Sequence, residues 1–152
     1  MEKLYNALLE KKLTLGSVES MTAGLFASEF TNVPGASKVF KGSIVSYSCL
    51  IKENVVGVKE ETIEKFGVVS KEVALEMAEN GRKLLGVDVC VSVTGNAGPT
   101  AEPGEKPVGC FYIAISAPSG SFVVEKNMSG KRNDIRNGAV LAMRDLAYLK
   151  VI

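Results

Sequence analysis

Short runs of β-branched residues alternate with longer segments of helical periodicity, and this alternation constrains the fold more than any other feature of the chain. The run at residues 87–93, Val-Asp-Val-Cys-Val-Ser-Val, has the β-branched density of a strand buried inside a sheet. Further strands are expected at residues 14–18 and 38–47, with Lys41-Gly42 as a bulge or a close backbone approach. Residues 109–117 and 121–126 flank Pro118-Ser119-Gly120, which is typical of an antiparallel hairpin.

Helices are expected between these strands. Ser70 is a candidate N-cap with Glu72 in the first turn, and Gly86 ends the helix that follows. Strands separated by helices, followed by a hairpin and a last helix, predict a three-layer α/β/α sandwich around a mixed, mostly parallel sheet. With 152 residues and 46% hydrophobic content, the chain suits a single domain over residues 1–152. The other helices are predicted at residues 4–12, 22–32, 49–55, 60–66 and 132–148.

Composition excludes several classes of function. Eighteen basic residues against 17 acidic ones give a net charge of +1, so the basic excess of a nucleic-acid-binding protein is missing and no nucleic-acid partner is expected. The first residues lack the apolar stretch of a signal peptide or membrane span, which predicts a soluble, cytoplasmic protein. Cys49, Cys90 and Cys110 are few, scattered and unaccompanied by histidine, so they predict reduced packing thiols and no metal site.

Ser20 stands where a predicted strand runs into a predicted helix, in a chain that contains no histidine. If Ser20 is a nucleophile, another group must take its proton, and lysine is the leading candidate. The simpler interpretation is that Ser20 or Thr22 caps the helix. The two interpretations are compatible, because the first N–H groups of the helix would also lie beside the hydroxyl and could hold a negative oxygen.

Tyr47 and Lys52 span another strand end and the first turn of the next helix, so both side chains could face one cleft. Taken alone, they are more commonly packing and surface residues. A lysine base must be neutral, so its pKa must fall from about 10.4 toward 7. That shift is worth roughly 4–5 kcal/mol, which desolvation can supply.

A third candidate segment, residues 94–99, follows the most hydrophobic strand and reads Thr-Gly-Asn-Ala-Gly-Pro. Its glycines leave the backbone open to a ligand, but the pattern of a nucleotide triphosphate loop is absent. Arg132 and Arg136 lie one turn apart at the start of the last helix, where they could bind a phosphate or carboxylate or simply form a solvated face.

Taken together and in this order, these segments resemble the competence-damage-inducible CinA C-terminal domain family, whose stand-alone members act as nicotinamide-nucleotide amidases. The match covers nearly the whole chain. It is carried by residues 19–24, 34–37, Tyr47 with Lys52, 67–70, 94–99, 106–109, and 130–132 with Arg136.

The resemblance implies that Ser20 is the nucleophile and Lys52 its general base, with Tyr47 assisting proton transfer or orienting the amine. The reaction would convert nicotinamide mononucleotide (NMN) and water to nicotinate mononucleotide and ammonia, without a metal or organic cofactor. A homodimer is also expected. Many relatives carry an N-terminal domain resembling molybdopterin-binding proteins, whose activity is not expected here. Substrate-binding residues implied by the resemblance are Thr22, Gly24, Thr94, Gly95, Ala97, Gly98, and Arg132 or Arg136.

The chain departs from the family pattern directly after Ser20. Met21 replaces a cysteine, and Ala23 replaces the first glycine of a pair. If that glycine has positive φ, alanine strains the loop; inside a regular helical turn it would instead raise helix propensity. Residues 100–103 also replace the usual Asp-Gly pair. Two alternatives therefore stay open: a non-catalytic nucleotide-binding or regulatory module, and an amidase for another small amide.

Overall fold

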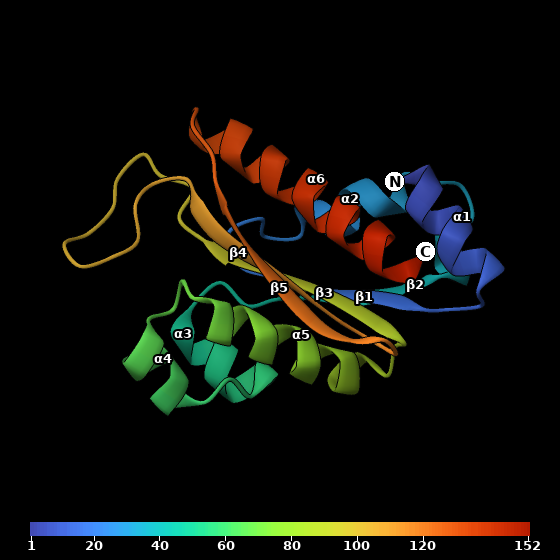
Figure 1. The fold of residues 1–152 in the computed structure, drawn as a ribbon, viewed down its shortest axis with the longest axis horizontal. Coiled ribbons are helices and arrows are strands. Elements are labelled where there is room, and N and C mark those ends of the chain that lie inside the picture. Colours follow the sequence, from blue (N-terminus) through green and yellow to red (C-terminus); the bar gives the residue numbers. More distant parts are fainter.

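A five-stranded mixed sheet forms the centre of the computed structural model, which describes residues 1–152 (Figure 1). The strand order is β2-β1-β3-β4-β5. β1 pairs in parallel with β2 and β3, whereas β4 pairs antiparallel with β3 and β5, so β4 alone runs against the others. The mixed α/β architecture predicted from the sequence is confirmed. The strands are β1 (Leu15–Glu19), β2 (Phe40–Val45), β3 (Val89–Gly95), β4 (Cys110–Ala117) and β5 (Gly120–Asn127).

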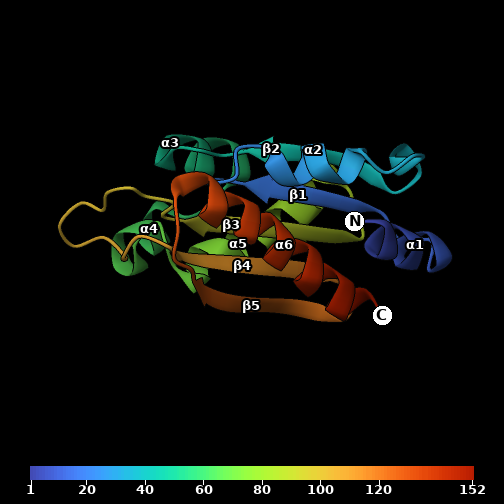
Figure 2. The same cartoon turned by 90° about the horizontal axis from the view of Figure 1, so that it is seen from above.

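Helices cover both faces of this sheet, as Figures 1 and 2 show. The helices of one face are α1 (Glu2–Glu10), α2 (Leu25–Thr31) and α6 (Arg132–Val151). On the other face are α3 (Cys49–Ile51), a π turn (Lys52–Val56), α4 (Glu60–Phe66) and α5 (Lys71–Leu85). None of the helices combines the length and the apolar character needed to cross a membrane.

The core lies on both sides of β3. Val89, Val91 and Val93 pack with the helices α1, α2 and α6, whereas Cys90 on the opposite face packs under α5 with Val18 and Met77. A strand in contact with both helical layers must be apolar throughout, which explains its near-continuous hydrophobic sequence. The strands β1 and β3 are therefore rigid elements, and their carboxyl ends can hold side chains precisely.

Several helix and strand boundaries differ from the predicted ones. The helix predicted at residues 22–32 begins only at Leu25, because residues 21–24 form a turn in which Ala23 (φ 49°) and Gly24 (φ 92°) are left-handed. The strand predicted at 38–47 spans Phe40–Val45, and a 3₁₀ turn at Ala36–Lys38 precedes it. The strand predicted at 87–93 spans Val89–Gly95.

Other local predictions are confirmed. The β1–β2 register steps from Leu15↔Phe40 to Gly16↔Gly42, so Lys41 is the extra residue of the expected bulge. The Ser70 hydroxyl accepts a hydrogen bond from Val73 N (3.3 Å), and Gly86 ends α5 with φ 61°. The hairpin of β4 and β5 is also present. The helix predicted at residues 49–55 instead divides into α3 and the π turn.

Candidate active site

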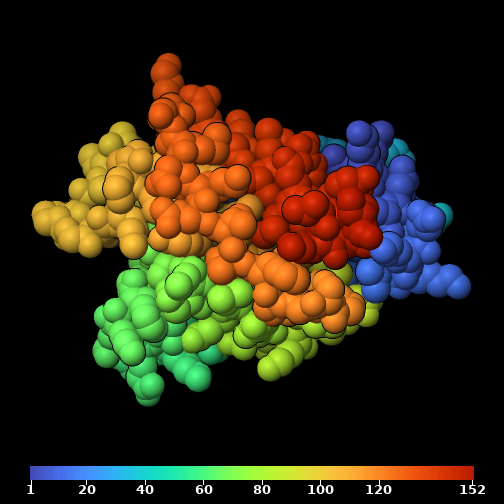
Figure 3. All heavy atoms as spheres, in the orientation of Figure 1, coloured from blue at the N-terminus to red at the C-terminus, as the bar shows by residue number.

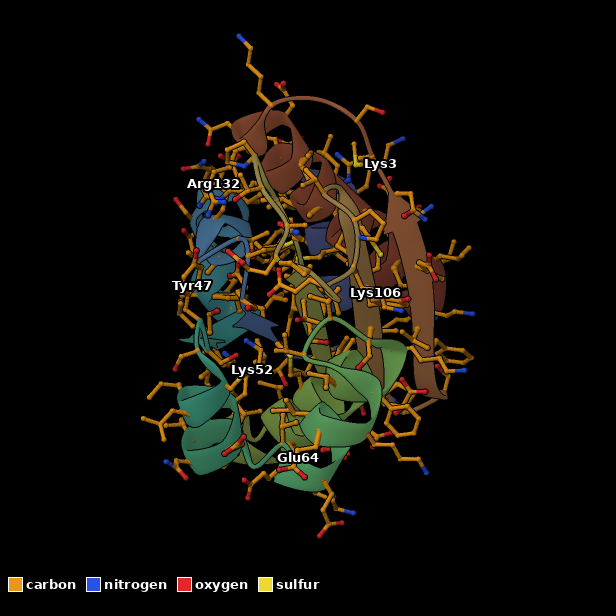
Figure 4. The ribbon with its side chains drawn as sticks, turned by 90° about the vertical axis from the view of Figure 1, so that its left-hand side faces the viewer. Lys3, Tyr47, Lys52, Glu64, Lys106 and Arg132 are labelled. Carbon is orange, nitrogen blue, oxygen red and sulfur yellow. The ribbon has the colours of Figure 1, made fainter.

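The carboxyl ends of the parallel strands β1, β2 and β3 open into one cleft of about 490 Å³, a volume typical of small-molecule sites. The segments that follow these strands all contribute to its wall, as does the start of α6. Figure 4 shows Tyr47 and Arg132 on one side, Lys106 on the other, and Lys52 below them. The other residues that line the cleft are Ser20, Met21, Ser48, Cys49, Phe66, Gly67, Val68, Val69, Thr94, Gly95, Asn96, Ala97, Gly104 and Glu105.

Ser20 and Lys52, which are 32 residues apart in the chain, meet in this cleft. Lys52 Nζ donates to Ser20 Oγ at 2.8 Å and to the carbonyl oxygen of Ser46 at 2.6 Å. The Lys52 residue is only 1% exposed, and neither of the two salt bridges in the chain involves it. The amine is therefore held against the serine hydroxyl in a nearly dry environment without a compensating carboxylate.

Burial changes the acidity of this amine. Desolvation lowers the pKa of Lys52 from 10.5 to about 8, while the nearby Cys49 thiol acts in the opposite direction. Lys52 opens the π turn, a rare distortion that is frequent at functional sites. The neutral amine is accordingly a minor species at pH 7 and becomes the major one above about pH 8.

Glu19 holds the turn that carries Ser20 and residues 21–24, the serine turn, through a buried hydrogen-bond network. Its carboxylate is fully buried and accepts hydrogen bonds from Phe26 N (2.9 Å) and Ala27 N (3.1 Å) at the start of α2. The hydroxyls of Thr22 (2.7 Å), Ser17 (3.3 Å) and Ser43 (3.2 Å) donate to it as well. The Ser17 hydroxyl shares its one proton between this carboxylate and Ser43 Oγ (2.8 Å), so four full donors and one shared donor fix the backbone on both sides of Ser20.

This network corrects two expectations about the helix entry. Neither Ser20 nor Thr22 caps α2, because Gly24 is its N-cap residue and makes no side-chain cap. The first N–H groups of the helix bond Glu19 and do not lie open beside Ser20. The backbone N–H groups of Met21 and Thr22 instead make no hydrogen bond within the chain, so they are free donors directly after the serine in the sequence.

The two arginines have different positions. Arg136 donates from Nε to the carbonyl of Met21 (3.0 Å) and from Nη2 to the carbonyl of Thr22 (3.1 Å), so it braces the serine turn from outside the cleft. Arg132 lines the cleft, where it donates to the carbonyl of Gly98 and to the hydroxyl of Tyr47 (3.1 Å). Only Arg132 is placed to meet a ligand.

The other predicted site residues also divide into those that line the cleft and those that do not. Tyr47 lines the cleft and is 60% exposed, but no hydrogen bond joins its hydroxyl to Lys52 or Ser20. Thr94 lines the cleft and donates to the carbonyl of Val68 (3.0 Å). Gly95 and Ala97 also line it, whereas Thr22, Gly24 and Gly98 do not.

Met21 and Ala23, the two departures from the family pattern after Ser20, have different structural consequences. Met21 is buried and fills the space beside Gly95, where an added Cβ would lie 2.6 Å from its Sδ. Its side chain therefore repacks the turn and makes no hydrogen bond, while its carbonyl oxygen accepts from Arg136. Ala23 is exposed and left-handed, a conformation that costs an L-residue about 1–2 kcal/mol.

Sequence reasoning missed two residues of this site. Ser46 orients Lys52 through its carbonyl oxygen, a contact that no side-chain pattern can reveal, and its own buried hydroxyl has no hydrogen-bond partner. Glu19 belongs to the quoted motif, but its role as a buried acceptor becomes visible only once α2 is folded against it. A carboxylate at the end of a buried strand was the available signal.

Comparison with known proteins finds one family throughout. The CinA C-terminal domain matches residues 1–149. A relative from Thermoanaerobacter sp. (strain X514), assigned by name to the competence-damage inducible proteins, is 48% identical over 147 residues, which are 96% of this chain and 36% of that protein. A CinA-like protein of Thermotoga maritima is 43% identical over 151 residues, 98% of this chain and 37% of the relative. The chain thus spans little more than a third of these relatives.

Solved structures agree. A CinA superfamily protein from Enterobacter cloacae superimposes with a TM-score of 0.96 at 25% identity, covering 99% of this chain and 89% of that one. The competence/damage inducible protein CihA from Agrobacterium tumefaciens gives a TM-score of 0.89 at 31% identity, covering 95% and 91%. The expected homodimer stays a prediction.

Proposed function

Because the chain belongs to the CinA C-terminal domain family, we propose that it is a nicotinamide-nucleotide amidase that hydrolyses NMN to nicotinate mononucleotide and ammonia. The observation that carries the proposal is the 2.8 Å contact between Lys52 Nζ and Ser20 Oγ inside the cleft. A hydroxyl beside an amine of lowered pKa is an arrangement that can activate a serine nucleophile in a chain without histidine.

The proposed reaction has two halves. The neutral amine of Lys52 takes the proton of Ser20 as Oγ attacks the carboxamide carbon, and the backbone N–H groups of Met21 and Thr22 hold the oxyanion. The C–N bond then breaks, and the amide nitrogen leaves as ammonia with the proton from Lys52. Water, deprotonated by the same amine, hydrolyses the ester, and Ser20 recovers its proton. The Ser46 carbonyl keeps the amine aimed at Ser20 in both halves.

The nucleotide end of the substrate would lie toward Arg132. Its guanidinium is held by Gly98 and Tyr47 and reaches the cleft, which suits a phosphate group. Tyr47 therefore supports Arg132 and offers its ring as a cleft wall. This assignment replaces a direct role for Tyr47 in proton transfer, because its hydroxyl contacts Arg132 and not Lys52.

The proposal is tested by ammonia release from NMN, measured beside nicotinamide riboside and glutamine, with Ser20→Ala as the control. We expect ammonia from NMN alone and its loss in the variant. Saturable NMN binding without ammonia would favour the non-catalytic module, and release from another amide alone would favour the third alternative.

A further inference from the structure

The segment of residues 96–109, between β3 and β4, projects from the body of the protein next to the cleft (Figures 1 and 3). Its base is closed by hydrogen bonds from Asn96 N to the carbonyl of Cys110 (3.0 Å) and from Gly109 N to the carbonyl of Asn96 (2.8 Å). Asn96 Nδ2 also donates to the carbonyl of Lys106 (3.3 Å). The projecting segment therefore delivers Lys106 to the cleft from an anchored base.

Lys106 is a cation that forms no salt bridge, although Glu105 lines the same cleft and Glu125 lies within the field of its charge. It lines the cleft and is exposed, and it takes part in neither of the two salt bridges of the chain. Its Nζ lies 5.8 Å from the centre of the Tyr112 ring, whose hydroxyl donates to Glu125 (3.0 Å). Such a contact at an exposed site is weak, so an anion in the cleft can displace it.

Lys106 and Arg132 line opposite sides of the cleft (Figure 4). The two cations come from separate elements, and both stand above Lys52 in this view. An anionic group bound to Arg132 would therefore lie within the field of a second positive charge on the opposite wall. Two cations around one site suit a phosphate dianion better than a neutral ribose hydroxyl.

We propose that Lys106 is a specificity-determining residue that leaves Tyr112 and binds the phosphate of the substrate, so that the cleft selects the nucleotide over the nucleoside. The inference rests on the proposed function for the identity of the substrate. It assigns to Lys106 the discrimination between NMN and nicotinamide riboside, and it leaves the reaction at Ser20 unchanged. Lys106 acts on the part of the substrate that does not react.

The test measures binding without turnover. NMN and nicotinamide riboside are titrated calorimetrically into the Ser20→Ala protein, alone and combined with Lys106→Met, Lys106→Arg or Lys3→Met. Lys3 is an exposed lysine of α1 away from the cleft, so its variant changes the net charge equally (Figure 4). We expect Lys106→Met to weaken NMN binding about tenfold and riboside binding by less than about twofold. Lys106→Arg should restore NMN binding, and Lys3→Met should change neither ligand.

An equal loss for both ligands, or no loss, would overturn the role of Lys106 while the amidase proposal stands. If NMN binding depends on Lys106 but the wild-type protein releases no ammonia from NMN, the role of Lys106 is supported and the amidase proposal is overturned. Absence of NMN binding to the Ser20→Ala protein would overturn the role of Lys106 in this form.

Discussion

The two ends of the cleft are built in opposite ways. At the reactive end, Ser20 is 7% exposed, Lys52 is 1% exposed and Glu19 is fully buried, and hydrogen bonds inside the chain hold all three. At the other end, Tyr47 is 60% exposed, and both Arg132 and Lys106 face solvent. The difference fits the proposed reaction, because a lysine base needs a dry environment to lose its proton, whereas a phosphate needs cations that it can reach.

Lys52→Met tests the reactive end most severely. Loss of the base should lower kcat/KM for NMN by about 10³-fold. The same variant should raise the free energy of unfolding, because methionine fills the site without a buried charge. The pKa difference between 10.5 and about 8 corresponds to at most about 3 kcal/mol, and unpaired Ser20 and Ser46 groups should reduce the net gain to about 1–2 kcal/mol.

The pH dependence of this gain has a definite sign. Below pH 8 the amine is charged in both the folded and the unfolded chain, so the cost of burial is complete. Between pH 8 and 10.5 the folded protein loses the proton first, and wild-type stability rises. Urea unfolding of both proteins at pH 7 and pH 9.5 should therefore show a smaller gain at the higher pH. A variant less stable than wild type at pH 7 would contradict the assigned cost.

Glu19→Ala tests whether the buried network holds the serine turn. The change leaves the N–H groups of Phe26 and Ala27 and the hydroxyl of Thr22 without their acceptor, so we expect a loss of about 3 kcal/mol in unfolding free energy. Glu29→Ala is the matched control, because Glu29 is exposed on the same helix and should change stability by less than about 0.5 kcal/mol. Equal effects of the two changes would show that the network is not required.

Activity should also follow the protonation of Lys52. We expect kcat/KM for NMN to rise about tenfold per pH unit from pH 6 and to level off above about pH 8, as the amine loses its proton. Steady-state rates from pH 6 to 9 provide the measurement. A flat profile over this range would exclude a titrating lysine base and would remove the chemical reason for the dry end of the cleft.

Ala23→Gly tests whether the left-handed backbone at Ala23, three residues after Ser20, is strained. Glycine adopts positive φ freely, and Ala23 is exposed, so the change should stabilise the fold by about 0.5–1 kcal/mol after the higher entropy of the unfolded chain is counted. Ala27→Gly within α2 is the control and should destabilise by about 1 kcal/mol. Thermal unfolding of the two variants should therefore shift in opposite directions, and a shift in the same direction would argue against strain at Ala23.

The sequence predicted most of the fold because the relevant signals are local. The β-branched run of β3, the cap at Ser70 and the bulge at Lys41 each depend on a few neighbouring residues. The start of α2 lies later than predicted, because Ala23 and Gly24 are left-handed and the buried carboxylate of Glu19 accepts from the N–H groups of Phe26 and Ala27. Tertiary contacts of this kind override local preference.

The site was predictable where it uses side chains at strand ends and unpredictable where it uses the backbone. Ser20 and Lys52 could be proposed as a pair from the missing histidine and from the motif. The Ser46 carbonyl, the free N–H groups of Met21 and Thr22, and the separate positions of Arg132 and Arg136 depend on how three loops meet. Arg136 and Arg132 are one helical turn apart, but only the structure shows that Arg136 binds the backbone of the serine turn and that Arg132 lines the cleft.

The central claim is that Ser20 forms an ester with the substrate, and partitioning with hydroxylamine tests it most directly. Hydroxylamine added during NMN turnover should divert product from nicotinate mononucleotide to the corresponding hydroxamate while ammonia release continues, and Ser20→Ala should form neither product. Ammonia and nicotinate mononucleotide without hydroxamate, or hydroxamate formed equally by Ser20→Ala, would contradict an acyl-enzyme on Ser20.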